Sequence, residues 1–83
     1  MSKEVLPRFS AIAKSIVAGS LYEHYNGLRY KIVGVARHSE TLEELIVYQA
    51  LYGEGDLWVR PLSMFLEHVV INGQSQPRFK PCS

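Results

Sequence analysis

Residues 45–61 have the sequence LIVYQALYGEGDLWVRP, and this stretch decides the fold. Two runs rich in β-branched and aromatic residues flank a glycine-containing centre, which is the pattern of a β-hairpin. A tight three-residue loop at 53–55 closes the hairpin, because Gly55 can adopt a left-handed conformation. Pro61 then ends the returning strand, since proline cannot donate to a ladder of hydrogen bonds. The segment predicts two antiparallel strands.

The same kind of pattern continues on both sides of this hairpin. Asn26-Gly27 and Asn72-Gly73 are strong hairpin signals. In the strand after Asn26-Gly27, the apolar alternation changes phase beyond Gly34, which indicates a bulge or a sharp bend. The strands predicted in this way are residues 20–25, 28–37, 45–52, 57–60, 68–71 and 76–79.

The segment before the first strand has helical spacing instead. From Pro7 onward, apolar residues recur at i, i+3, i+4, i+7 and i+8, and Gly19 suits a left-handed stop. This spacing predicts an amphipathic helix of about three turns over residues 8–18. Its apolar face is expected to cover the sheet of the same domain rather than a membrane. Residues 62–67 have room for one further helical turn.

Five or six short strands, tight turns and one bend predict a mainly β domain, a small and strongly curled antiparallel barrel. An open sheet covered by the N-terminal helix is the alternative. The division expected is a tail and amphipathic helix at 1–18 and the β-barrel domain at 19–83.

Composition narrows the possible functions. The chain has 83 residues, enough for one domain, and a formal net charge of +1. Nucleic-acid binding usually requires a strongly basic domain, so it is possible here but not favoured. The only cysteine, Cys82, cannot form an internal disulfide, and no apolar run is long enough to span a bilayer. These features predict a cytoplasmic protein without a membrane partner.

The sequence resembles a bacterial family known as domain of unknown function 1653. The blocks that carry the resemblance are, in chain order, HYNG at 24–27, ARHSET at 36–41, VYQALYG at 47–53, WVRP at 58–61, MF at 64–65 and PRF at 77–79. The resemblance covers about residues 20–80 and implies a compact SH3-like β-barrel. It implies no activity, substrate or cofactor, and fold alone would not supply one.

The best candidate for a binding site comes from strand parity. A three-residue loop at 53–55 would pair Tyr48 with Arg60, Ala50 with Trp58 and Tyr52 with Asp56. The opposite face then holds apolar residues that resemble a core. One surface is left with four candidate ligand-binding residues: Tyr48, Tyr52, Trp58 and Arg60. Aromatic rings beside an arginine suit peptide recognition, base stacking or cation–π contacts. Alternatively, these rings form a second packed layer beneath the helix.

The string at 38–41, His38-Ser39-Glu40-Thr41, is the most enzyme-like part of the sequence. Adjacent side chains diverge, however, so a nucleophile and its base rarely lie next to each other in sequence. We interpret the string as a loop in which His38 and Glu40 rim the candidate site. Catalysis is therefore the less favoured interpretation of this string, and the question whether the chain is an enzyme stays open.

No metal site and no cofactor are predicted. None of the three histidines has metal-ligand spacing with another histidine or with Cys82. The leading hypothesis is a module that binds a peptide, a protein or a small polar ligand. Single-stranded nucleic-acid binding through the same aromatic residues is the second, and an enzyme using His38 with Glu40 or Ser39 is the third. The oligomeric state is left open, because either a sheet edge or the helix could support a dimer.

Overall fold

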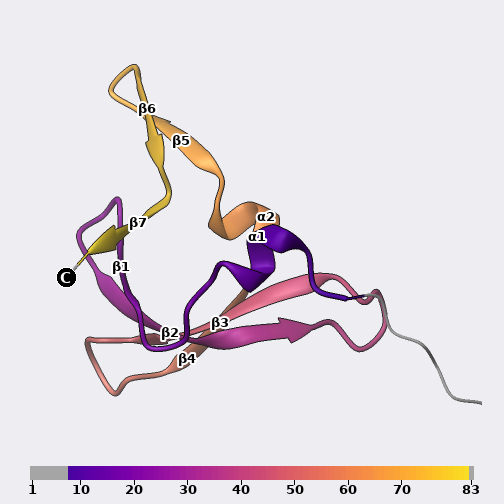
Figure 1. The fold of residues 1–83 in the computed structure, drawn as a ribbon. Helices are drawn as coiled ribbons and strands as arrows, with labels where there is room; N and C mark the ends of the chain where they lie inside the picture. The colour runs from indigo at the N-terminus through magenta and orange to yellow at the C-terminus, as the bar shows by residue number, and fades with distance from the viewer. Residues whose placement is uncertain (1–7, 83) are drawn as a thin grey trace, which may run out of the picture.

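The computed structural model describes residues 8–82 (Figure 1). Strands dominate these residues, and the two helices among them are one turn each. In chain order the elements are α1 (Ala11–Lys14), β1 (Leu21–His24), β2 (Arg29–Arg37), β3 (Glu44–Ala50), β4 (Leu57–Pro61), α2 (Leu62–Phe65), β5 (His68–Ile71), β6 (Gln74–Pro77) and β7 (Phe79–Cys82).

Five of these strands form one antiparallel sheet in the order β4-β3-β2-β1-β7, and β5 and β6 form a separate hairpin. The two outer strands of the sheet do not pair with each other, so the predicted closed barrel is not formed and the sheet is open. In Figure 1 the β5–β6 hairpin projects away from the sheet, and β7 returns to lie beside β1. The mainly β, antiparallel character that the sequence predicts is confirmed.

The two predicted Asn-Gly turns are present where their residues require them. Gly27, with φ +94°, and Gly73, with φ +79°, adopt the conformation that favours glycine. The β1–β2 turn is held by the Gly27 amide, which donates to the His24 carbonyl at 2.8 Å. The predicted irregularity in β2 is also found, because the β2–β3 register shifts between Ile32 and Gly34. The bulge allows both Ile32 and Val35 to face the core.

The predicted three-turn helix over residues 8–18 is wrong. Only one α-helical turn forms, α1, with Ser10 as its N-cap. Beyond α1 the chain joins the sheet: the Gly19 amide donates to the Ile32 carbonyl at 2.8 Å, and the Ile32 amide donates to the Ser20 carbonyl at 2.9 Å. The left-handed Gly19, with φ +89°, and the hydrogen bonds of Gly19 and Ser20 with β2 direct the chain into β1, so tertiary contacts override the helical spacing of the residues before it. The short turn still covers the core, because Ala13 is buried in it.

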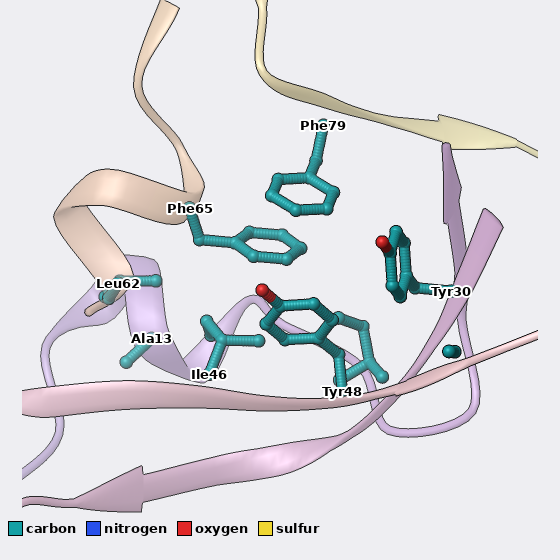
Figure 2. Close-up of a cluster of buried hydrophobic side chains, with 9 residues drawn as sticks. Ala13, Tyr30, Ile46, Tyr48, Leu62, Phe65 and Phe79 are labelled. Carbon is teal, nitrogen blue, oxygen red and sulfur yellow. The ribbon is translucent and has the colours of Figure 1, made fainter. Parts of the chain in front are cut away.

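The core lies on one face of the sheet, which we call the inner face. Ile32, Ile46, Tyr48 and Ala50 are buried on it. Figure 2 shows the rings of Phe65, from α2, and Phe79, from β7, over this face. Their centroids are 4.2 Å apart and their planes lie 8° from parallel. Two elements that are distant in sequence, α2 and β7, therefore cover the core.

One contact ties the N-terminal turn to β3. The Glu44 carboxylate accepts hydrogen bonds from the Ser10 amide at 2.6 Å and from the Ser10 hydroxyl at 2.8 Å. These bonds favour the charged carboxylate and hold the pKa of Glu44 below its usual value of 4.5.

A pH dependence of stability follows from this contact. Because the pKa of Glu44 is lower in the folded chain, its contribution is complete above pH 4.5 and is lost as the pH falls below that value. In urea unfolding, Glu44→Gln should therefore destabilise the protein at pH 6 and make a smaller difference at pH 3. An equal difference in unfolding free energy at both pH values would show that the charge of Glu44 does not matter.

Candidate functional site

The six predicted site residues fall in two separate places. Tyr48, Tyr52, Trp58 and Arg60 belong to the β3–β4 hairpin and its loop, whereas His38 and Glu40 lie in the loop between β2 and β3. No hydrogen bond or ion pair within residues 8–82 joins the second group to the first. The hairpin and the loop therefore have to be considered separately.

The strand register of the hairpin differs from the predicted register by two residues. Tyr48 is paired with Trp58, and Ile46 with Arg60, because the loop is longer than three residues. The Ala50 amide still donates to the Asp56 carbonyl, at 2.9 Å. A shift of two residues preserves the face on which each side chain lies. Tyr48, Trp58 and Arg60 consequently share one face, as predicted.

That face is the inner one, and the prediction of its exposure is wrong for Tyr48. The Tyr48 side chain is only 3% exposed and belongs to the core. The residues expected to form the core on the opposite face are the exposed ones, with Leu57 at 64% and Val59 at 58%. The face that carries Tyr48 is the buried one because Phe65 and Phe79 pack against it. The ring centroid of each lies 5.5 Å from that of Tyr48.

Two of the four hairpin residues are open to solvent and one is half-buried. Trp58 lies at the sheet edge and is 49% exposed. Tyr52 is exposed in the loop, and its hydroxyl is 2.7 Å from the hydroxyl of Tyr30. Arg60 is half-buried. We call Tyr52, Trp58 and Arg60, together with the Tyr48 hydroxyl, the arginine–aromatic surface.

Arg60 is the central group of this surface. Its Nε donates to the Tyr48 hydroxyl over a long 3.4 Å, and its guanidinium carbon lies 5.7 Å from the Phe79 ring centroid. No carboxylate in residues 8–82 is close enough to form an ion pair with it. A guanidinium carries five donors, so most of its hydrogen-bonding capacity is available. The aromatic surroundings position the charge without neutralising it.

Tyr30 and His24 adjoin this surface, although the sequence did not single them out. The Tyr30 ring makes edge contacts with Tyr48, Tyr52 and Phe79. Burial, and then its hydrogen bond with Tyr52, raises the pKa of Tyr30 far above its usual value of 10.0. Only one feature of the sequence pointed to a buried Tyr30: it lies on the same face of its predicted strand as Ile32.

The His24 ring lies 4.9 Å from the Phe79 ring, edge to face. Burial is the main cause that lowers the pKa of His24 below 6.5, and the positive charges of Arg60 and Arg78 lower it further, against a hydrogen bond with Asn26. His24 is therefore predominantly neutral at pH 7.

His38 and Glu40 have a local role in the β2–β3 loop. His38 Nδ1 accepts the amide hydrogens of Glu40 at 3.1 Å and Thr41 at 3.3 Å. The Thr41 hydroxyl accepts the Glu43 amide hydrogen at 3.2 Å. Because His38 Nδ1 accepts these two amide hydrogens, it stabilises the loop and is not available as a base. Nothing here arranges His38 as a catalytic group.

A further hollow lies elsewhere on the molecule. A cavity of about 300 Å³ lies beside the two helical turns, lined by residues including Ile12, Leu62 and Leu66. Its lining is mostly apolar, and the Glu44 carboxylate at its border is already bonded to Ser10. Its lining also includes Glu43 and Ser63 but no arginine, lysine or aromatic side chain, so the hollow is a weaker candidate for binding an anionic or aromatic group than the arginine–aromatic surface.

Within residues 8–82, no three histidine, cysteine, aspartate or glutamate side chains lie close enough to hold a metal ion. Likewise, no helix in this part of the chain is long and apolar enough to cross a membrane.

Comparison with known proteins places the chain in a family. Residues 20–81 match the model of the family described as protein of unknown function DUF1653. A crystal structure of a DUF1653 protein from Bordetella bronchiseptica is similar, with 35% identity and a TM-score of 0.71; the match covers 81% of this chain and 87% of that one. No curated protein matches. The family match spans well over half of the sequence, so this chain belongs to the DUF1653 family.

Proposed function

We propose that this chain is a small binding module, and that its arginine–aromatic surface receives an anionic or polar group of a peptide, a protein or a small ligand. One observation carries the proposal: Arg60 is half-buried against aromatic rings, yet no carboxylate in residues 8–82 neutralises it. A buried cation is ordinarily paired, because desolvation is costly. An arginine held in this way is prepared for an anion from outside the chain.

The neighbours of Arg60 suit the same role. Trp58 offers an exposed ring that can contribute contact area at little cost in conformational entropy. Tyr52 supplies a hydroxyl at the other end of the surface. A guanidinium can bind a carboxylate through two parallel hydrogen bonds, which adds geometric specificity to the electrostatic attraction. Recognition of a carboxylate or phosphate group is therefore the chemistry that this surface supports best.

Trp58 provides a direct way to test the proposal, because it is the only tryptophan in the chain. We would follow its fluorescence while titrating short acidic peptides, inorganic phosphate and a single-stranded oligothymidine. Arg60→Ala should weaken binding of the responsive probe by about tenfold or more, since hydrogen bonds to charged groups contribute roughly 1.5–3 kcal/mol. Arg60→Lys should restore only part of the affinity, because a lysine cannot bind a carboxylate bidentately.

The matched control is Lys31→Ala, which removes the same charge from an exposed position on the outer face. It should leave the affinity nearly unchanged. If Lys31→Ala and Arg60→Ala weaken binding equally, the attraction is general electrostatics and the site assignment fails. No fluorescence response to any probe at millimolar concentration would count against the binding function itself.

Single-stranded nucleic-acid binding is distinguished by the same titration. It would use base stacking on Trp58 and a phosphate contact with Arg60. The affinity for oligothymidine, which would involve several phosphates, should then fall more steeply with salt concentration than the affinity for an acidic peptide held through one carboxylate. The net charge of +1 favours the peptide or small-ligand alternative.

With a single cysteine and no internal disulfide, we place this module in the cytoplasm.

A further inference from the structure

The strand that carries Trp58 and Arg60 is at the edge of the sheet. β4 has β3 as a neighbour on one side, and no strand in residues 8–82 pairs with its other side. Leu57, Trp58 and Val59 are all exposed along it. An apolar edge strand of this kind is a template for pairing with another strand, and natural proteins usually protect it.

The backbone groups that β4 presents at this edge follow from its register. The hydrogen bond from the Ala50 amide to the Asp56 carbonyl makes these two residues a hydrogen-bonded pair. In an antiparallel ladder such pairs alternate, so Trp58 and Arg60 also direct their backbone groups toward β3. Leu57 and Val59 consequently direct their amide and carbonyl groups outward. Pro61 is the next outward position, and it has no amide hydrogen.

We infer that this edge binds a second copy of the chain, with β4 pairing antiparallel to β4 about a two-fold axis at Trp58. In this register Leu57 lies opposite Val59 of the second copy, and all four of their outward groups form hydrogen bonds without requiring Pro61. The two Trp58 rings meet in a non-hydrogen-bonded pair, where opposing side chains are closest. The outer face gains two apolar Leu57–Val59 pairs.

The charges along β4 favour a second copy of the chain as the partner that binds this edge. The same register places Asp56 opposite Arg60 of the second copy, and it does so twice, because the axis is two-fold. Asp56 is exposed, and no carboxylate in residues 8–82 is paired with Arg60. To reach Asp56, the Arg60 side chain has only to exchange its long 3.4 Å bond with the Tyr48 hydroxyl for an ion pair. The strand is therefore complementary to itself in backbone, apolar surface and charge.

This inference goes beyond the proposed function; because both use Arg60 and Trp58, we expect dimerisation and anion binding to compete. One strand pair buries less area than a standard stable interface, so we expect a weak dimer with a dissociation constant on the order of 10–100 μM. Sedimentation equilibrium of the full chain should show reversible dimerisation over this range. The Trp58 emission should shift to shorter wavelength as the concentration rises, because dimerisation buries its ring.

Charge reversal gives the decisive experiment. Asp56→Arg alone and Arg60→Asp alone each convert both ion pairs to like-charge contacts, so each variant should dimerise about tenfold more weakly or not at all. When the two variants are mixed in equal amounts, the heterodimer has one opposite-charge pair on each side of the axis. Mixing should therefore restore dimerisation to nearly the wild-type level.

Two further variants separate the interface from general effects. Glu54→Arg makes the same charge change as Asp56→Arg at an exposed position in the loop before β4, and it should leave dimerisation unchanged. Val59→Pro removes an outward amide without touching the β3–β4 ladder, so it should abolish the dimer while the circular dichroism spectrum stays native.

A wild-type chain that remains monomeric at 1 mM, or a dimer that neither charge reversal nor Val59→Pro affects, would overturn the inference. Failure of the mixed variants to associate would also overturn the proposed register. Asp56→Arg lies outside the arginine–aromatic surface and should keep its response to the anionic probes. Because this variant disrupts the dimer but keeps Arg60 and Trp58, it tests ligand binding separately from dimerisation.

Discussion

Replacing Phe65 with alanine should lower the free energy of unfolding by about 3–5 kcal/mol, the range measured for large aromatic side chains truncated in a core. Phe65 is 0% exposed and stacks on Phe79. Its ring also makes edge contacts with Tyr22 at 5.3 Å and Tyr48 at 5.5 Å. Alanine would leave a cavity where α2, β1, β3 and β7 meet, and the backbone of these elements cannot collapse to fill it.

A loss of this size is large for a small domain. At roughly 0.05–0.15 kcal/mol per residue, a chain of 83 residues is stable by about 4–12 kcal/mol. Urea unfolding followed by circular dichroism would measure the change, and the slope of the transition should stay the same. Leu66→Ala is the control, because Leu66 is adjacent in sequence but exposed, and it should cost less than about 1 kcal/mol. A Phe65→Ala variant as stable as Leu66→Ala would contradict the placement of α2 over the core.

The second large effect concerns Tyr48 and Trp58, which are direct partners on neighbouring strands. Tyr48→Ala should cost about 3–5 kcal/mol, because this ring is buried among Tyr30, Phe65 and Phe79. Trp58→Ala removes a larger ring from a half-exposed position and should cost only about 1 kcal/mol. The smaller aromatic residue is thus expected to have the larger effect on stability.

Tyr48→Phe separates packing from hydrogen bonding. It keeps the ring and removes the hydroxyl that accepts the long hydrogen bond from Arg60, so its cost should be about 1 kcal/mol or less. Thermal or urea unfolding of the three variants would give the comparison. If Trp58→Ala were as damaging as Tyr48→Ala, Trp58 would be a core residue, and the arginine–aromatic surface would not be available to a ligand.

The turns and most of the strands could be predicted from the sequence because their signals are local. Asn-Gly pairs specify tight turns wherever they occur, and Gly34 marks the bulge where the alternation changes phase. The helical turn α2 was also expected at its position. Strand β7 was missed, since Lys80 and Pro81 resemble a polar tail. It forms only because β1, far earlier in the chain, offers an edge to pair with.

The inward face of the β3–β4 hairpin could not be predicted from local pattern. Both faces are apolar, with Leu57 and Val59 on one and Tyr48 and Trp58 on the other. Which face is buried depends on where Phe65 and Phe79 pack, and this is a long-range property. The same reasoning applies to the site: parity correctly grouped Tyr48, Trp58 and Arg60, but no sequence pattern shows that Arg60 has no carboxylate beside it. The enzyme-like string at 38–41 also drew in His38 and Glu40, but the hydrogen bonds of His38 stay within its own loop.

The central claim is that Arg60 binds an anion from outside the chain on the surface it shares with Trp58. The most direct test is a ¹H–¹⁵N NMR titration of the full chain with the acidic peptide or phosphate probe that changes Trp58 fluorescence. We expect the largest shifts at the Arg60 side-chain Nε–H and the Trp58 indole N–H, with little change in the His38–Glu43 loop. Shifts centred on that loop, or spread evenly over the exposed lysines and arginines with Arg60 among the least affected, would contradict the claim.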